Sequence, residues 1–425
     1  MTSDTTPEQQ PAAAPRLAFL RSATVVAVGM AIMNVAAYGF TLIAVHRLVP
    51  EQFGAVTALL GLLLIGNVAS LGLQASGARR IATHVGPGEA ALADSMLKAG
   101  RRAALALTAV FLVAAPLFMW LLHIDSLVAA LLVAPTLGFL TVMGSQLGVL
   151  QGGKNWTELA AVYTSTGIGR LVFGGGALFV HPSLTSAMVG LAIGAAVPAL
   201  LGGFLLRGSS GGTPAQVKEV LRETVHGTHT LLAFFVIANA DVLLARGLLD
   251  AQHSGYYAAG VIVAKACLFL PQFVIVVVFP SLATAPGDTQ RLRRAIQAVA
   301  ALGVCTVLGA LALPDIVVKV VGGSDYAPVG PIAWLFALAG SSYAVLQLVV
   351  YAAIAQQEKR AALLIWVGLA SLAIATLIIL GTDIATGMTG VKVLVAMTAT
   401  CALALSAALA SGLHRQTPTV NPVDS

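Results

Sequence analysis

The chain has 425 residues, of which 58% are hydrophobic and only 9% are charged, and its mean hydropathy is +0.91. A soluble domain carries about 25% charged residues, so this chain has too few charges to cover a surface that faces water. The composition excludes a soluble globular protein and predicts an all-α membrane protein. The net charge of +6 does not indicate a nucleic-acid partner, because it arises from the membrane topology described below.

Hydrophobic runs long enough to cross a bilayer follow one another along the chain. A spanning helix needs about 20 mainly apolar residues. Twelve runs meet this requirement: 23–45, 55–75, 102–122, 127–150, 159–180, 184–206, 229–248, 256–280, 296–321, 329–355, 361–381 and 389–412. We therefore predict twelve transmembrane helices. The polar segment 1–15 is predicted to be a disordered tail, and no cleavable signal peptide is expected.

The basic residues alternate between the connections. Of the 23 Lys and Arg residues, 17 lie in the terminal segments and the even-numbered connections, four lie in the odd-numbered connections, and two lie inside spans. Cytoplasmic loops carry an excess of Lys and Arg, so this bias places both termini in the cytoplasm. We predict a multi-pass protein of the bacterial plasma membrane.

The sixth connection divides the chain into two halves. The predicted parts are an N-lobe of six helices at 16–207, a cytoplasmic linker at 208–228, a C-lobe of six helices at 229–413 and a cytoplasmic tail at 414–425. The halves resemble each other, because Leu48 stands six residues before Gly54 and Leu249 stands six residues before Gly255. Such a repeat is typical of transporters built from two lobes around a central cavity.

Short motifs along the chain resemble those of a transporter family. The first exterior turn and the second span contain Leu48, Pro50, Glu51, Phe53, Gly54, Gly72, Leu73, Arg79 and Arg80 at the family's positions. The seventh and eighth spans contribute Asn239, Asp241, Gly255, Tyr257, Ala258, Ala259, Phe279 and Pro280. In order and spacing these motifs resemble the polysaccharide-type (Wzx-like) flippases of the multidrug/oligosaccharidyl-lipid/polysaccharide (MOP) exporter superfamily, over residues 16–415.

The resemblance implies a MATE-like fold and transport by alternating access. The implied substrate is a polyprenyl-diphosphate-linked oligosaccharide, moved from the cytoplasmic to the outer leaflet. The implied partners are this glycolipid, membrane lipids and the glycan-assembly machinery. Three alternatives stay open: a lipid II flippase, which usually has two further C-terminal spans; a cation-coupled multidrug exporter, which usually has an acid in its first span, where this chain offers Asn34 and Tyr38; and a membrane glycan polymerase or ligase.

A flippase must carry phosphate groups through a medium of low dielectric constant, where unpaired charges are costly. Arg170 is the first candidate for a phosphate contact, because it lies near the middle of the fifth span among glycines, too deep to reach the interface. Arginine suits the task because its planar fork binds phosphate oxygens in pairs. The alternative is an arginine that caps carbonyl groups or joins two helices.

Asp241 and Lys265 lie on consecutive antiparallel spans at similar distances from the turn near Gly255. Three interpretations stay open. The two residues form an ion pair that fixes the packing, or Asp241 with Asn239 binds a coupling Na⁺ or H⁺, or Lys265 contacts phosphate. The cation site is implied by the resemblance, since related lipid II flippases are thought to hold sodium near the matching acid.

Other polar residues are weaker candidates for substrate contacts. Arg79 and Arg80 follow the second span and are predicted to attract the diphosphate, with anchoring at the membrane surface as the alternative. Arg21 is a further phosphate candidate, and Asn34 is a candidate for sugar hydroxyls.

An enzyme is not expected, because the eight histidines are scattered, no metal-binding spacing occurs and no catalytic residue is identified. No cofactor is predicted.

Overall fold

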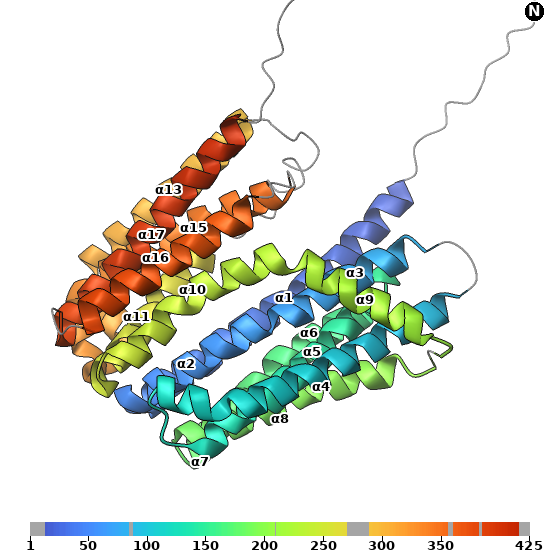
Figure 1. The fold of residues 1–425 in the computed structure, drawn as a ribbon, viewed down its shortest axis with the longest axis horizontal. Helices are drawn as coiled ribbons and strands as arrows, with labels where there is room; N and C mark the ends of the chain where they lie inside the picture. The colour runs from blue at the N-terminus through green and yellow to red at the C-terminus, as the bar shows by residue number, and fades with distance from the viewer. Residues whose placement is uncertain are drawn as a thin grey trace, which may run out of the picture.

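The computed structural model describes residues 13–84, 88–208, 210–269, 289–355, 360–381 and 385–415. All regular structure in these residues is helical (Figure 1). The helices of the first half are α1 (Ala13–Arg47), α2 (Pro50–Gly66), α3 (Val68–Ala82), α4 (Glu89–Leu121), α5 (Leu127–Gly152), α6 (Trp156–Gly169), η1 (Arg170–Gly175), α7 (Gly176–Val180) and α8 (Leu184–Leu205). The helices of the second half are α9 (Pro214–Gly227), α10 (His229–Leu248), α11 (Ala251–Phe269), α13 (Thr289–Ala312), α14 (Pro314–Val321), η2 (Gly323–Ile332), α15 (Ala333–Ala355), α16 (Ala361–Gly381) and α17 (Gly387–Arg415).

Ten helices of the described residues are long and apolar enough to cross a membrane, two fewer than the twelve predicted spans. The fifth predicted span, 159–180, is divided into α6, η1 and α7, because the six residues of η1 form a π-helix. The eighth, 256–280, begins as α11 and continues beyond the described residues. The ninth, 296–321, is wrong as one helix, because Pro314 ends α13 and begins the short α14.

The helices form two groups, which we call the N-lobe (α1–α8) and the C-lobe (α10–α17). In the N-lobe α5 packs against α3, α4 and α8, and α6 packs against α1 and α8. In the C-lobe α15 packs against α11, α13 and α17, and α10 packs against α16. Figure 1 shows the lobes diverging from the region where α2 meets α10 and α11. The predicted architecture of two helical lobes is therefore present.

The two glycines of the sequence repeat lie against each other at the junction of the lobes. A Cβ atom on Gly255 would lie 2.1 Å from the Pro50 carbonyl oxygen, and one on Gly54 would lie 3.0 Å from the Gly255 nitrogen. Only residues without a side chain allow α2 and α11 to approach so closely. The repeat therefore marks the contact between the lobes.

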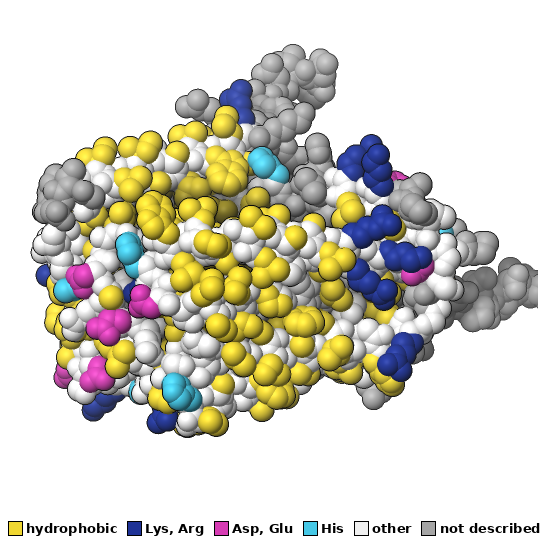
Figure 2. All heavy atoms as spheres, turned by 60° about the horizontal axis from the view of Figure 1, so that its bottom comes forward, with side chains coloured by type: hydrophobic (Ala, Val, Ile, Leu, Met, Phe, Trp, Pro, Cys, Tyr) yellow, Lys and Arg dark blue, Asp and Glu magenta, His cyan; other side chains and the backbone are white. Residues whose placement is uncertain are grey.

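Charged side chains divide the two ends of the helix bundle (Figure 2). We call one the basic end; its exposed cations include Arg79, Arg101, Arg102, Lys154, Arg207, Arg293 and Arg294. We call the other the acidic end; its exposed acids are Glu51, Asp125, Asp250, Asp315 and Asp325. Between them Figure 2 shows a hydrophobic belt. This distribution is typical of a protein that spans a bilayer.

The close contact between α8 and the π-helix gives a test of the packing. A Cβ atom on Gly190 would lie 2.2 Å from the carbonyl oxygen of Phe173. Gly190→Ala is therefore expected to destabilise the protein by about 1–3 kcal/mol, as overpacking does, and to lower the midpoint of thermal unfolding in detergent. Gly176→Ala is the matched control, because no atom lies within 4 Å of that position. Equal midpoints for the two variants would contradict the packing.

Candidate functional site

Arg170 begins the π-helical segment η1, which interrupts the fifth predicted span. It lies about 21 Å along the helix from the start of α6 at 1.5 Å per residue, which is near the middle of the segment formed by α6, η1 and α7. The segment contains Gly174 and Gly175, and π-helical turns inside α-helices occur frequently at functional sites. Arg170 therefore lies at the depth that the sequence predicted and on a locally irregular backbone.

The guanidinium group of Arg170 has no ionic partner within the described part of the chain. Its carbon lies 5.0 Å from the ring centre of Phe40 in α1, and its buried Nε–H group has no hydrogen-bond partner. A buried donor without a partner is costly, so native proteins rarely leave one. Among the described residues Arg170 caps no carbonyl group, but its contact with Phe40 joins η1 to α1, as the alternative of an arginine that joins two helices predicts.

Lys265 of α11 approaches Arg170 from the opposite lobe. The Lys265 ammonium lies 3.4 Å from Asn239 Oδ1 of α10 and interacts electrostatically with both Asp241 and Arg170. Among the described side chains, Lys265 and Asp241 are not in direct ion-pair contact. Asp241 instead accepts a hydrogen bond of 3.0 Å from the Tyr257 hydroxyl, and its buried Oδ1 has no partner.

These residues form a charged group between the lobes with an excess of positive charge. Arg170 and Lys265 supply two cations and Asp241 supplies one acid. The group is flanked by α1, where the Tyr38 hydroxyl donates to the Ile262 carbonyl of α11 at 3.1 Å. Asn34 is exposed and lies four residues before Tyr38, so it occupies the same face of α1. Such a group can attract an anion.

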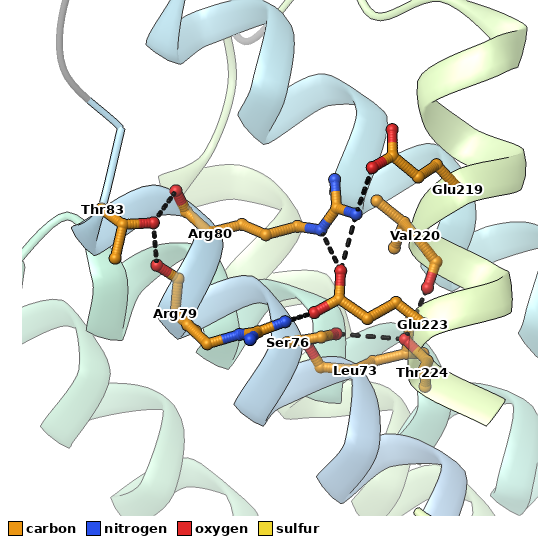
Figure 3. A network of polar contacts seen from close by, with 9 residues as sticks. All are labelled: Leu73, Ser76, Arg79, Arg80, Thr83, Glu219, Val220, Glu223 and Thr224. Carbon is orange, nitrogen blue, oxygen red and sulfur yellow. Dashed lines mark hydrogen bonds and ion pairs between the residues drawn. The ribbon is translucent and has the colours of Figure 1, made fainter. Parts of the chain in front are cut away.

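Arg79 and Arg80 lie apart from this group, at the basic end of α3. Arg80 donates to Glu223 at 2.6 Å and to Glu219 at 3.0 Å, and Arg79 pairs with the other oxygen of Glu223 (Figure 3). Both glutamates belong to α9 in the linker. The sequence did not predict these partners. The Arg21 side chain lies outside the described residues.

Arg246 joins the lobes at the acidic end, and the sequence did not identify it as a site residue. It is only 6% exposed and lies in the last turn of α10. It donates to the carbonyl groups of Leu122 at 2.9 Å, His123 at 2.8 Å and Glu51 at 3.2 Å, all in the N-lobe. One signal was present, since a charged residue inside an apolar run is a functional suspect.

The turn beside Arg246 is also held by polar contacts. Ser254 accepts a hydrogen bond of 3.0 Å from Arg246, and Asp250 accepts one of 3.0 Å from the His253 N–H group. Partial burial opposes ionisation of Asp250, but the hydrogen bonds from His253 outweigh it and hold the pKa of the Asp250 carboxyl below its ordinary value. The start of α11 is thereby fixed against the N-lobe.

The fold is similar to those of solved transporters. The lipid II flippase MurJ in an inward closed conformation matches with a TM-score of 0.72 and 12% identity, over 93% of this chain and 90% of that chain. An inward-facing multidrug resistance MATE family transporter of the MOP superfamily matches with a TM-score of 0.71 and 11% identity, over 91% of this chain and 96% of that chain. An outward-facing transporter of the same description matches with a TM-score of 0.56 and 11% identity, over 93% and 96%. The sequence matches no protein-family profile and no curated protein.

These similarities show that the chain has the MATE-like fold of the MOP superfamily transporters, as the resemblance implied. Hydrogen bonds between described residues of the two lobes lie in the half of the bundle nearer the acidic end, including those of Tyr38 and Arg246. The structure is therefore closed at the acidic end.

Proposed function

We propose that the protein is a flippase that moves a polyprenyl-diphosphate-linked oligosaccharide from the cytoplasmic to the outer leaflet. The observation that carries this proposal is the excess positive charge at Arg170 and Lys265 between the lobes, with a buried Arg170 donor that lacks a partner. A diphosphate supplies the oxygens that this donor needs. The sugar and the phosphates would lie between the lobes while the polyprenyl chain stays in lipid.

The charge of the ends supports the direction of transport. We infer that the basic end lies in the cytoplasm of a bacterial plasma membrane, because cytoplasmic loops are rich in Lys and Arg. The closed acidic end then faces outward, so this conformation receives substrate from the cytoplasmic side. Arg79 and Arg80 lie at that side, where the diphosphate arrives, and Asn34 lies on the face of α1 between them and Tyr38.

A flipping assay tests the proposal directly. The purified protein would be placed in proteoliposomes with a fluorescent polyprenyl-diphosphate oligosaccharide, and the fraction accessible to an impermeant quencher would be followed over time. Protein-dependent flipping supports the proposal. Extrusion of a cationic dye without flipping of the glycolipid would contradict it and favour a multidrug exporter.

A lipid II flippase is the second candidate, because a lipid II flippase has the same fold with a TM-score of 0.72. Lipid II also carries a diphosphate on a polyprenyl chain, so the same cations would serve it. The two substrates differ in their sugars and peptide. Competition between the fluorescent oligosaccharide lipid and unlabelled lipid II in the same vesicles distinguishes them. Interaction with glycan-assembly proteins would accompany the first function.

Asp241 and Asn239 are proposed to couple transport to a gradient of Na⁺ or H⁺. Asp241 Oδ1 is buried without a partner, while Tyr257 holds the other oxygen and Asn239 lies within 3.4 Å of Lys265. A carboxylate oxygen of this kind can accept a proton or a cation. The bound charge would change the electrostatic balance with Lys265, and hence the affinity for the diphosphate.

Asp241→Asn is expected to abolish the response of flipping to an imposed gradient. The amide keeps the size of the side chain and can bond to Tyr257, but it neither ionises nor neutralises a cation. The measurement compares flipping rates with and without Na⁺ and H⁺ gradients at matched protein amounts. Asp315→Asn is the control, because Asp315 is exposed at the acidic end. A gradient response of wild-type size in Asp241→Asn would exclude the coupling role.

A further inference from the structure

Helix α9 lies on the N-lobe although it leads into the C-lobe. Its apolar face buries Val217 and Val220 against Leu73 of α3 and Met96 of α4. At its start, Thr213 and Gln216 form a capping box. The linker therefore contains an ordered amphipathic helix that binds the first lobe.

The beginning of α9 is fastened to α4 by polar contacts. The Gly212 N–H group donates to Asp94 at 2.8 Å, and Lys98 donates to the Gly212 carbonyl at 3.1 Å. Ser95 donates to Gln216 at 3.0 Å. The end of α9 continues through Thr228 directly into α10, the helix that carries Asp241. One end of α9 is thus held by the N-lobe, while the other end must follow any movement of the C-lobe.

The polar face of α9 covers the two arginines of α3. Figure 3 shows the Glu223 carboxylate between the guanidinium groups of Arg79 and Arg80, with one oxygen toward each, and Glu219 at the outer side of Arg80. Ser76 and Thr224 are hydrogen-bonded beside them at 3.0 Å. Two cations face two acids, so the charge is balanced. A planar carboxylate held by two guanidinium groups presents its oxygens as a phosphate would.

The strength of this contact suits a reversible latch. The Arg79 side chain is 67% exposed and that of Glu219 is 56% exposed, so water and salt weaken the Arg79–Glu223 and Arg80–Glu219 ion pairs, while the Arg80–Glu223 pair is less exposed, at 18% and 26%. A diphosphate carries more charge and more acceptor oxygens than the glutamates do, and it competes for the same donors. Once released, α9 has 14 residues, which is too short to remain helical by itself.

We propose that Glu219 and Glu223 occupy the phosphate site of Arg79 and Arg80 in the resting protein, and that a substrate diphosphate displaces them and frees α9. The release loosens the connection between the N-lobe and α10, which permits the lobes to move after substrate has bound. This proposal rests on the proposed function, since it takes the diphosphate of the glycolipid as the ligand.

Amide hydrogen exchange of residues 216–224 tests the latch in the full chain, in nanodiscs of zwitterionic lipid with geranylgeranyl diphosphate as the probe. The diphosphate is expected to speed exchange of α9 in the wild type. Glu219→Gln/Glu223→Gln is expected to exchange rapidly without the probe and to bind it about five- to tenfold more tightly, as expected for removal of competing exposed ion pairs. Arg79→Gln/Arg80→Gln should exchange rapidly and bind the probe more weakly.

Glu89→Gln/Glu158→Gln is the matched control. It changes the net charge equally at the same end of the N-lobe, and neither acid forms an ion pair with a described side chain. It should behave as the wild type. Two further probes separate the sources of phosphate: nanodiscs that contain phosphatidylglycerol, and inorganic pyrophosphate, which has no lipid chain. If phosphatidylglycerol releases α9 as strongly as geranylgeranyl diphosphate does, the latch is overturned in favour of a general anionic-lipid site.

The two proposals fail in different ways. If the wild type binds the probe and flips glycolipid but α9 exchange does not change, or if the double glutamine variant binds no more tightly, the latch is overturned and the flippase stands. If the wild type neither binds the probe nor flips glycolipid, both proposals are overturned. The exchange measurement needs no transport, so a loss of activity in any variant does not affect it.

Discussion

Replacing Arg170 by alanine is expected to slow glycolipid flipping by at least about 30-fold, because truncating one partner of a buried charged contact costs about 2–5 kcal/mol. Arg170 is a half-buried cation in the described structure with no ion pair, and its buried Nε–H group has no partner, so a bound phosphate would supply the acceptor that this donor lacks. The measurement is the flipping rate in proteoliposomes with matched amounts of protein.

Arg170→Lys separates charge from shape. Lysine keeps the positive charge but lacks the planar fork, so an intermediate rate is expected. Arg101→Ala is the control, since Arg101 is an exposed cation at the basic end, and its rate should equal that of the wild type. A purely structural role makes a different prediction: Arg170→Ala would lower the midpoint of thermal unfolding and leave the rate per folded molecule unchanged.

Most of the helices were predictable from composition alone. In lipid every backbone polar group must be bonded internally, so an apolar run of about 20 residues has little choice but to form a helix. The runs that failed as single helices each contain a local feature that hydropathy does not report. One feature is the glycine-rich π-helix that begins at Arg170, and the other is Pro314 at the start of α14.

The contacts between distant segments were less predictable. The sequence repeat indicated that Gly54 and Gly255 are equivalent, but not that they touch each other. The linker helix α9 has a polar face, but the partner of that face lies 143 residues away, at Arg80. The hydrophobic periodicity of a helix shows which of its faces is polar but not which segment packs against that face. The sequence therefore carried no signal for the pairing of Arg79 and Arg80 with glutamates.

Within the candidate site, the similar depths of Asp241 and Lys265 were predictable by counting residues from the turn between their helices. The direct partners were not, because Tyr257 and Asn239 take the positions next to the two charges. Arg246 was missed for another reason. A charge at the end of a span usually faces water, and here the His123 backbone, with a φ of 46°, and its neighbours bring carbonyl groups to it.

Arg246→Ala is expected to open the acidic end. The change removes the donors of three N-lobe carbonyl groups, and each buried group left without a partner costs about 1–3 kcal/mol. These bonds exist only while the lobes touch, so their loss shifts the population toward conformations that are open at that end. Leu243→Cys, in a background without Cys267, Cys305 and Cys401, reports this opening, because Leu243 is partly buried next to Gly61 at the contact between the lobes.

The measurement is the rate at which an impermeant thiol reagent, added on the acidic side, labels that cysteine. We expect at least about a tenfold increase for Arg246→Ala, which corresponds to about 1.4 kcal/mol. Arg47→Ala is the matched control, because Arg47 also donates to carbonyl groups near the acidic end, those of Leu178 and Phe179, but within the N-lobe. If Arg246→Ala, like Arg47→Ala, is labelled at the wild-type rate while both variants remain folded, the closure of the acidic end does not depend on Arg246. Ser254→Ala, which removes a single bond to Arg246, should give a smaller increase in the same direction and serves if Arg246→Ala does not fold.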